Sequence, residues 1–154
     1  KAKPNIKFSS DFIIGYPGET EEDFDQTVEL VKKVKFINSY SFVFSARPGT
    51  PAFNLKSIDQ HITKERLMKF QNICKMIKTE YRETLLSKKL KVLFENKTKN
   101  GNKYFGRDEY YNSVIVESNE NLIGKTMNTK ITNVNQNTLF GVIISKQNQA
   151  EFAA

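Results

Sequence analysis

Cysteine, histidine and tryptophan are nearly absent from this chain. Its 154 residues include one Cys, one His and no Trp. The single Cys74 cannot form an internal disulfide, and one thiol with one imidazole cannot supply the ligands of a Cys-rich zinc site or an iron–sulfur cluster. Cys74 follows Leu67 and Phe70 at helical spacing, which favours a buried packing residue over a reactive thiol. His61 lies in a polar segment and is predicted to be a surface residue.

Long apolar runs are missing as well. No segment approaches the roughly 18 apolar residues needed to cross a membrane. The first residues, Lys1 to Asn5, contain neither an initiator methionine nor the apolar core of a signal peptide. We therefore expect a cytoplasmic protein, or a piece cut from one, that has no membrane partner.

The positive charge is concentrated in the middle of the sequence. Residues 1–55 contain seven basic and seven acidic residues, residues 56–91 contain ten and four, and residues 92–154 contain seven and six. A basic segment of this kind favours a polyanion such as nucleic acid as partner. A solvated, lysine-rich helix face explains the same charge equally well.

The first 55 residues are predicted to form a β-α-β unit. Phe12 to Ile14 resembles a short buried strand, and Thr20 is a good helix N-cap with Asp23 in the reciprocal capping-box position. A second strand is expected over residues 40–44. Two strands joined by a helix are parallel, so the fold class is α/β for this part. One such unit leaves a sheet face and both edges uncovered, and their neighbours must come from elsewhere.

The remaining residues divide into a connector and an all-β part. Residues 56–88 are predicted to be a loop and a long connecting helix, because apolar residues recur there at spacings of three and four. Residues 89–146 contain four or five short strand patterns and the Asn100-Gly101 turn signal, which indicate a small antiparallel barrel of the OB type. A β-sandwich fragment is the alternative. Residues 147–154 are predicted to be a disordered tail.

Two loops resemble those of the radical-SAM methylthiotransferases. Asp11 to Phe24 (DFIIGYPGETEEDF) is similar to a late strand and helix of that family's TIM-like barrel, and Ser45 to Ala52 (SARPGTPA) to the next strand-end loop. The second loop is typical of the branch that makes 2-methylthio-N6-dimethylallyladenosine in tRNA. Residues 105–107, 122–125 and 139–141 resemble the TRAM domain at the end of these enzymes. The likeness covers about residues 5–145.

The resemblance implies a C-terminal portion of an enzyme. The family uses two [4Fe–4S] clusters and S-adenosylmethionine, and its cluster ligands are the cysteines of a CxxxCxxC run and of an N-terminal domain. This chain contains neither the CxxxCxxC run nor the cysteines of that N-terminal domain. We therefore expect it to bind no cofactor and to be inactive alone, with the missing N-terminal part of the same enzyme as a partner. A non-catalytic TRAM-type RNA-binding protein and a methylthiotransferase of the ribosomal-protein branch are the alternatives.

The resemblance also implies candidate site residues in the barrel portion. Ile13 and Gly15 match two positions of the strand that contacts the adenine of S-adenosylmethionine in radical-SAM barrels. A structural strand with a glycine in a sharp turn is the alternative. Arg47 is a candidate for binding a carboxylate or an RNA phosphate, or it braces its own loop. No catalytic residue and no metal ligand is predicted.

The TRAM resemblance implies tRNA binding, with the anticodon stem-loop as the expected ligand. Lys97, Lys99 and Lys103 surround the Asn100-Gly101 turn, and Phe105 and Arg107 follow. Basic residues would bind phosphates and exposed aromatic rings would stack on unpaired bases. In the alternative interpretation, Tyr104 and Phe105 are alternating core and surface residues of a strand.

Overall fold

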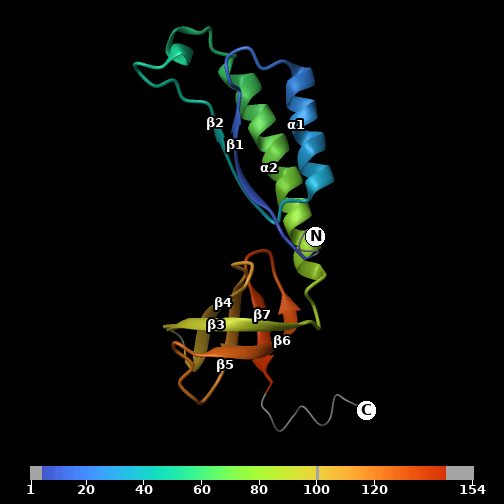
Figure 1. The fold of residues 1–154 in the computed structure, drawn as a ribbon, viewed down its shortest axis with the longest axis vertical. Helices are drawn as coiled ribbons and strands as arrows, with labels where there is room; N and C mark the ends of the chain where they lie inside the picture. The colour runs from blue at the N-terminus through green and yellow to red at the C-terminus, as the bar shows by residue number, and fades with distance from the viewer. Residues whose placement is uncertain (1–4, 100, 145–154) are drawn as a thin grey trace. The chain divides into compact units, whose positions relative to one another are not determined.

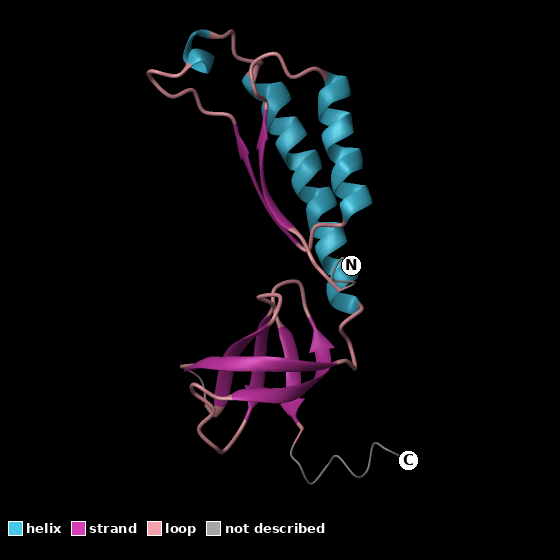
Figure 2. Ribbon diagram, viewed as in Figure 1, coloured by secondary structure: helices cyan, strands magenta, loops and turns pink. Residues whose placement is uncertain are grey.

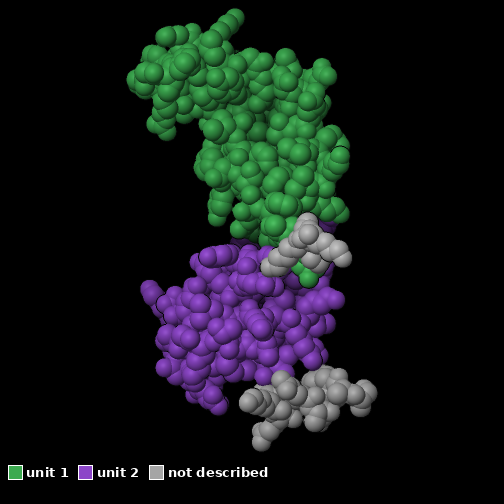
Figure 3. All heavy atoms as spheres, viewed as in Figure 1, with its two compact units in different colours: residues 1–78 green, residues 79–154 purple. Residues whose placement is uncertain are grey.

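The computed structural model describes residues 5–99 and 101–144. It divides the chain into two compact units, residues 1–78 and 79–154 (Figure 3). The elements of the first part are β1 (Ser9–Ile14), α1 (Glu21–Val34), β2 (Asn38–Val43), the short 3-10 helix η1 (Pro51–Asn54) and α2 (Gln60–Glu83). The second unit contains β3 (Lys89–Lys97), β4 (Lys103–Asp108), β5 (Ser113–Glu117), β6 (Thr126–Val134) and β7 (Leu139–Ile143). The predicted tail, residues 147–154, lies outside the described residues, as do Asn100 and residues 145–146.

The first unit contains the predicted β-α-β arrangement. β1 and β2 are parallel, with Ser9 opposite Asn38, and α1 forms the crossover between them (Figures 1 and 2). The predicted capping box is present, because Thr20 Oγ1 accepts a hydrogen bond from the Asp23 backbone and Asp23 Oδ2 accepts one from the Thr20 backbone. A hydrogen bond from the Thr20 hydroxyl to Asp23 Oδ2 at 2.7 Å, together with the bond from the Thr20 backbone, lowers the pKa of the Asp23 carboxyl. Local sequence therefore fixes where this helix begins.

Both helices pack on one face of the two-stranded sheet. Phe12 of β1 contacts Phe70 of α2 with ring centroids 4.9 Å apart. The buried core consists of Ile14, Phe24, Val28, Val31, Phe70 and Ile77. Cys74 is half-buried against this cluster, and burial raises the pKa of its thiol. The predicted connecting helix thus supplies part of the core of the first unit.

A buried arginine joins the turn after β1 to α2. Arg66 is 8% exposed, and its Nη1 donates to Glu19 Oε1 at 2.9 Å and to the Glu19 carbonyl at 3.1 Å. Nη2 and Nε donate to Glu21 Oε2 at 2.8 and 3.1 Å. Glu19 also accepts the backbone N–H of Gly15 through its other oxygen at 3.0 Å. One guanidinium therefore holds both the strand-end turn and the first residue of α1.

The second unit is a closed five-stranded barrel in the order β3-β4-β5-β7-β6, with β6 pairing back to β3. The closure confirms a small barrel and excludes the sandwich alternative. One pairing corrects the prediction of antiparallel strands throughout: β5 and β7 are parallel, with Val114 opposite Leu139. β6 follows β5 in the sequence and runs in the opposite direction, and β7 reverses the direction again. β5 and β7 therefore run the same way.

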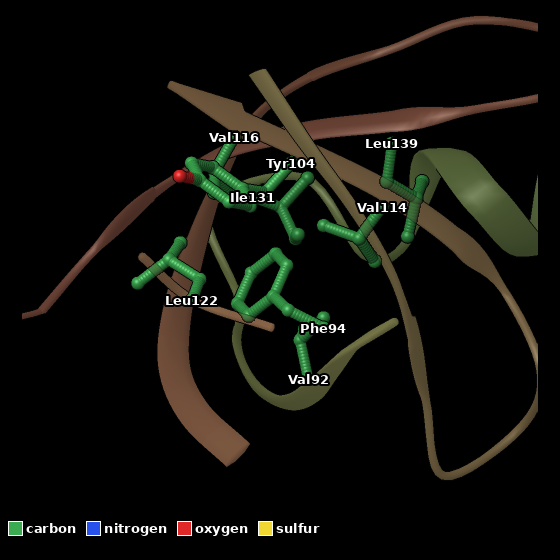
Figure 4. Packing of buried hydrophobic residues seen from close by; sticks show 8 residues of the cluster. All are labelled: Val92, Phe94, Tyr104, Val114, Val116, Leu122, Ile131 and Leu139. Carbon is green, nitrogen blue, oxygen red and sulfur yellow. The ribbon is translucent and has the colours of Figure 1, made fainter. Parts of the chain in front are cut away.

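The barrel interior is filled by apolar side chains from all five strands and one loop (Figure 4). They are Val92, Phe94, Tyr104, Val114, Val116, Leu122, Ile131 and Leu139. Two glycines allow strands to approach closely: a Cβ on Gly106 would lie 2.4 Å from the Leu93 carbonyl, and one on Gly141 would lie 2.6 Å from the Lys130 carbonyl. Strand crossings of this kind require glycine.

We predict that Arg66→Met destabilises the first unit by about 3–5 kcal/mol, because it leaves the Glu19 carboxylate buried without its partner. The control is Lys69→Met on the same helix, whose ion pair with Asp25 at 3.3 Å is about half exposed; it should cost less than about 1 kcal/mol. Urea unfolding followed by the helical circular dichroism signal measures both. Equal destabilisation of the two variants would contradict the assigned role of Arg66.

Candidate nucleic-acid interface

Three of the five predicted basic and aromatic residues lie on β4, where side chains alternate between the barrel core and its outer surface; Lys97 ends β3, and Lys99 lies in the connection between the two strands. Lys103, Phe105 and Arg107 point outward, whereas Tyr104 and Asp108 are buried. The alternation follows from the period of two in a β-strand. Of the two neighbouring aromatic residues, Tyr104 is therefore a core residue, and Phe105 presents its ring at the surface.

Arg107 is held in a fixed orientation by three neighbours. Its guanidinium carbon lies 5.6 Å from the centre of the Phe105 ring and 5.9 Å from the centre of the Tyr111 ring. Its Nε donates to Glu95 Oε2 at 3.4 Å. Cation–π contacts at these distances stabilise a guanidinium against an aromatic ring. The result is a surface group in which a cation lies between the half-buried ring of Phe105 and the exposed ring of Tyr111.

The three predicted lysines differ in their surroundings. Lys97 lies with its Nζ 5.8 Å from the centre of the Tyr104 ring, and Lys103 forms an ion pair with Glu117 at 3.3 Å. Lys99 is exposed, and neither Lys97 nor Lys99 has an ion-pair partner among the described residues. Lys97 and Lys99 can therefore approach phosphates without first separating from an acidic partner.

A shallow polar hollow of about 520 Å³ lies beside Lys103. Its lining consists of Gly101, Asn102, Lys103, Glu117, Ser118 and Asn119. The hydrogen bond from Asn102 Nδ2 to Asn119 Oδ1, at 3.2 Å, joins the β3–β4 and β5–β6 connections across it. The hollow offers amide and hydroxyl groups beside the Lys103–Glu117 ion pair, so a phosphate that binds Lys103 there has to compete with the Glu117 carboxylate.

The turn between β4 and β5 is organised by the buried Asp108, which the sequence pattern did not single out. Its Oδ1 accepts the backbone N–H groups of Tyr110 and Asn112 at 2.9 and 2.8 Å, and its Oδ2 accepts Asn112 Nδ2 at 2.8 Å. Between them, Tyr111 has a φ of 61°. An Asp followed by Asn four residues later is the sequence signal that could have indicated this turn.

The candidate residues of the first unit have different surroundings. Ile13 is 61% exposed on the sheet face that the helices do not cover, opposite Phe42. Gly15 has a φ of 79°, and a Cβ there would lie 2.4 Å from Thr63 Cγ2. Its N–H already donates to Glu19. The turn and the approach of Thr63 therefore account for glycine at this position.

Arg47 lies in the exposed loop after β2. Its carbonyl accepts hydrogen bonds from the backbone N–H and the hydroxyl of Thr50, at 3.2 and 2.8 Å. Its guanidinium makes no hydrogen bond or ion pair with another described residue. The main chain of Arg47 thus shapes the loop, and its side chain remains available to a ligand.

Metal-binding clusters and membrane spans are both absent from residues 5–99 and 101–144. No group of three or more His, Cys, Asp or Glu side chains in these ranges is placed to hold a metal ion. Nor does any helix of this part of the chain have the length and apolar character that a membrane span requires.

Comparison with known proteins finds a domain match for the barrel and relates most of the chain to a group of named synthases. Residues 84–144 match the TRAM domain. The chain is 53% identical over 141 residues to a tRNA-2-methylthio-N(6)-dimethylallyladenosine synthase of Pelagibacter ubique (strain HTCC1062), an alignment that covers 92% of the chain and 32% of that protein. Proteins of the same name from Wolbachia pipientis subsp. Culex pipiens (strain wPip) and Rickettsia rickettsii (strain Sheila Smith) are each 40% identical, over 92% and 94% of the chain and 33% of their own lengths.

The predicted resemblance to the tRNA methylthiotransferases is therefore confirmed. The chain spans about a third of the length of the curated relatives it matches.

We predict that Asp108→Ala destabilises the barrel by about 1–3 kcal/mol, because three buried or half-buried N–H groups are left without their acceptor. The carboxylate also supports the charged form of Arg82, whose pKa is lowered by burial. Asp108→Asn keeps one acceptor oxygen and should be less destabilising. The neighbouring Glu109→Ala is the surface control, with a change within about 0.5 kcal/mol. Urea unfolding monitored by tyrosine fluorescence measures all three, and an unaffected Asp108→Ala barrel would contradict this assignment.

Proposed function

We propose that this chain is the C-terminal portion of a tRNA-2-methylthio-N6-dimethylallyladenosine synthase, and that its own contribution is to bind the tRNA substrate. The observation that supports this most is an identity of 53% that extends over 92% of the chain and includes both units. The TRAM match over residues 84–144 supports the barrel as the RNA-binding part. A ribosomal-protein substrate finds no support among these relatives.

In this proposal the β3–β4 hairpin and the connection between its strands bind the anticodon stem-loop. Lys97, Lys99 and Lys103 neutralise phosphates of the RNA backbone. Phe105 and Arg107 contact unpaired nucleotides of the loop, because single-stranded bases offer ring faces that a duplex hides. The hollow beside Lys103 accommodates part of the sugar–phosphate backbone.

The iron–sulfur clusters belong to the remainder of the enzyme. A cluster requires several thiolate ligands, and this chain has one cysteine, which is half-buried in the helix core. In the whole enzyme the clusters and S-adenosylmethionine supply the radical that activates the adenine carbon. Ile13 fits an apolar contact with the cofactor's adenine, since it is exposed beside Phe42. Gly15 contributes through its shape, because its N–H is already bonded to Glu19.

The uncovered face of the β1–β2 sheet looks, in this proposal, into the interior of a barrel that the rest of the protein completes, so Ile13 stays open to the cofactor. Ile13, Tyr40 and Phe42 are exposed there, with Asp11 opposite Tyr40. A parallel sheet is normally covered on both faces, and the relatives are about three times the length of the segment they share with this chain. The N-terminal part of the same enzyme completes this barrel in our proposal, and the chain alone is inactive.

We predict that replacing Lys97, Lys99 and Lys103 together by Ala weakens binding of an anticodon stem-loop RNA and flattens its salt dependence. Removing one lysine–phosphate pair should reduce the slope of log K against log salt concentration by about 0.7–0.9. Fluorescence anisotropy at several salt concentrations measures both the affinity and the slope.

The matched control replaces Lys32, Lys33 and Lys56, three exposed lysines of the first unit, by Ala. It removes the same charge and should leave both the affinity and the slope close to those of the unmodified chain. Equal effects of the two triple variants would indicate that net charge alone causes binding, and the proposed face would then be wrong.

We predict further that the purified chain contains no iron and does not bind S-adenosylmethionine, because it lacks the thiolate ligands and most of the barrel. Iron analysis and isothermal calorimetry test this. Joining the chain to the N-terminal part of a relative should give a protein that assembles its clusters and modifies tRNA. An iron-replete preparation of the chain alone would overturn the division of roles.

A further inference from the structure

Among the described residues of the barrel unit, Tyr111 is the most exposed large aromatic residue. Its side chain is 72% exposed, and its backbone has a φ of 61°, a conformation that aromatic residues rarely adopt. The bonds from Tyr110 and Asn112 to Asp108 hold the backbone on either side of it. The buried Asp108 carboxylate thus holds Tyr111 in an unfavourable backbone conformation. In this conformation the Tyr111 ring is exposed to solvent.

Arg107 lies against this ring on one side and against Phe105 on the other, at 5.9 and 5.6 Å from the ring centres. Its Nε donates to Glu95, and its two terminal nitrogens have no hydrogen-bond partner among the described residues. Glu95 partly offsets the charge of Arg107, whereas Lys97 and Lys99 have no ion-pair partner among the described residues. The geometry of Arg107 provides a flat, oriented group beside an exposed ring.

The apolar surface continues from Phe105 across two further strands. Phe105 lies opposite Ile115 of β5, and Ile115 lies opposite Phe140 of β7. All three side chains are half-buried on the outer face of the barrel, since the residues beside them in each strand point inward. Phe105, at the β4 end of this row of apolar side chains, contacts Arg107, and Arg107 in turn lies against Tyr111; Lys103 is on the same strand as Phe105.

We propose that Tyr111 and Arg107 form a stacking site for one unpaired base of the bound RNA. The base lies on the ring of Tyr111, and the terminal nitrogens of Arg107 donate hydrogen bonds to its edge or to the adjoining phosphate. Aromatic and guanidinium surfaces are the two protein groups on which unpaired bases stack. This inference rests on the proposed function and adds to it a residue to which the sequence pattern assigned no role.

The test compares RNA binding by the full chain and its Tyr111→Asn, Tyr111→Phe and Tyr111→Trp variants. Asparagine adopts positive φ readily, so Tyr111→Asn removes the ring and keeps the turn. We expect it to weaken binding of an anticodon stem-loop RNA roughly 5- to 150-fold, the range for loss of one stacked base. Tyr111→Phe should bind as the unmodified chain does, because the ring face is retained.

Two further readouts separate stacking from charge. Tyr111→Asn should leave the salt slope unchanged, since every lysine–phosphate pair is retained, and it should not affect binding of a fully paired RNA duplex. The chain contains no tryptophan, so Tyr111→Trp carries a single tryptophan fluorophore, which the stem-loop should quench. Leu30→Trp, at an exposed position on α1 in the first unit, is the control and should not be quenched.

The possible failures are distinguishable. If the unmodified chain binds the stem-loop and Tyr111→Asn binds it equally, without quenching of Tyr111→Trp, the stacking site is wrong and the proposed RNA face stands. Unchanged affinity together with a reduced salt slope would likewise overturn stacking, since it indicates a phosphate contact. If the unmodified chain binds neither stem-loop nor duplex, the proposed function fails and the stacking site with it.

Discussion

The alternation of side chains along β4 is the constraint on which both the barrel core and its outer face depend. Tyr104 fills the interior, and Gly106 lets the Leu93 carbonyl approach to within 2.4 Å of where a Cβ would stand. Phe105 lies between these two residues and Arg107 follows them, so both must point outward. A shift of register by one residue would place a guanidinium in the core and the Tyr104 ring in solvent. The packing energy of the barrel therefore also fixes the orientation of its binding residues.

At the end of β4 the inward-facing position is occupied by a residue that forms hydrogen bonds instead of filling the apolar core. Asp108 points into the protein, but its carboxylate accepts hydrogen bonds from the turn that follows. Burial of this group is tolerated because its oxygens are satisfied. The turn, in return, holds Tyr111 against Arg107. A polar group inside the barrel thus determines the arrangement of an aromatic group outside it.

The features that could be predicted from the sequence depend on neighbouring residues. The capping box of Thr20 and Asp23, the parallel β-α-β unit and the small barrel are all present. Three features could not be predicted because they join residues far apart: the Glu19–Arg66 contact across 47 positions, the approach of Thr63 to Gly15 and the parallel β5–β7 pair. Tyr111 was missed because its significance lies in a backbone angle that composition does not reveal. The roles of Ile13, Arg47 and the lysines in binding stay predictions.

The two units differ in how fully their strands are paired and their apolar side chains are covered. This difference bears on the proposed division of roles. The barrel closes on itself, so each of its strands has two neighbours. The β1–β2 sheet has one face on α1 and α2, and on the other face it exposes Ile13 and Phe42 side by side. Exposed apolar groups on a parallel sheet cost free energy in water unless another surface covers them. A unit built in this way is suited to be part of a larger barrel, whereas the closed barrel can present a binding face without further support. On this argument the closed barrel and the open β-α-β unit are suited to separate roles in the enzyme we propose.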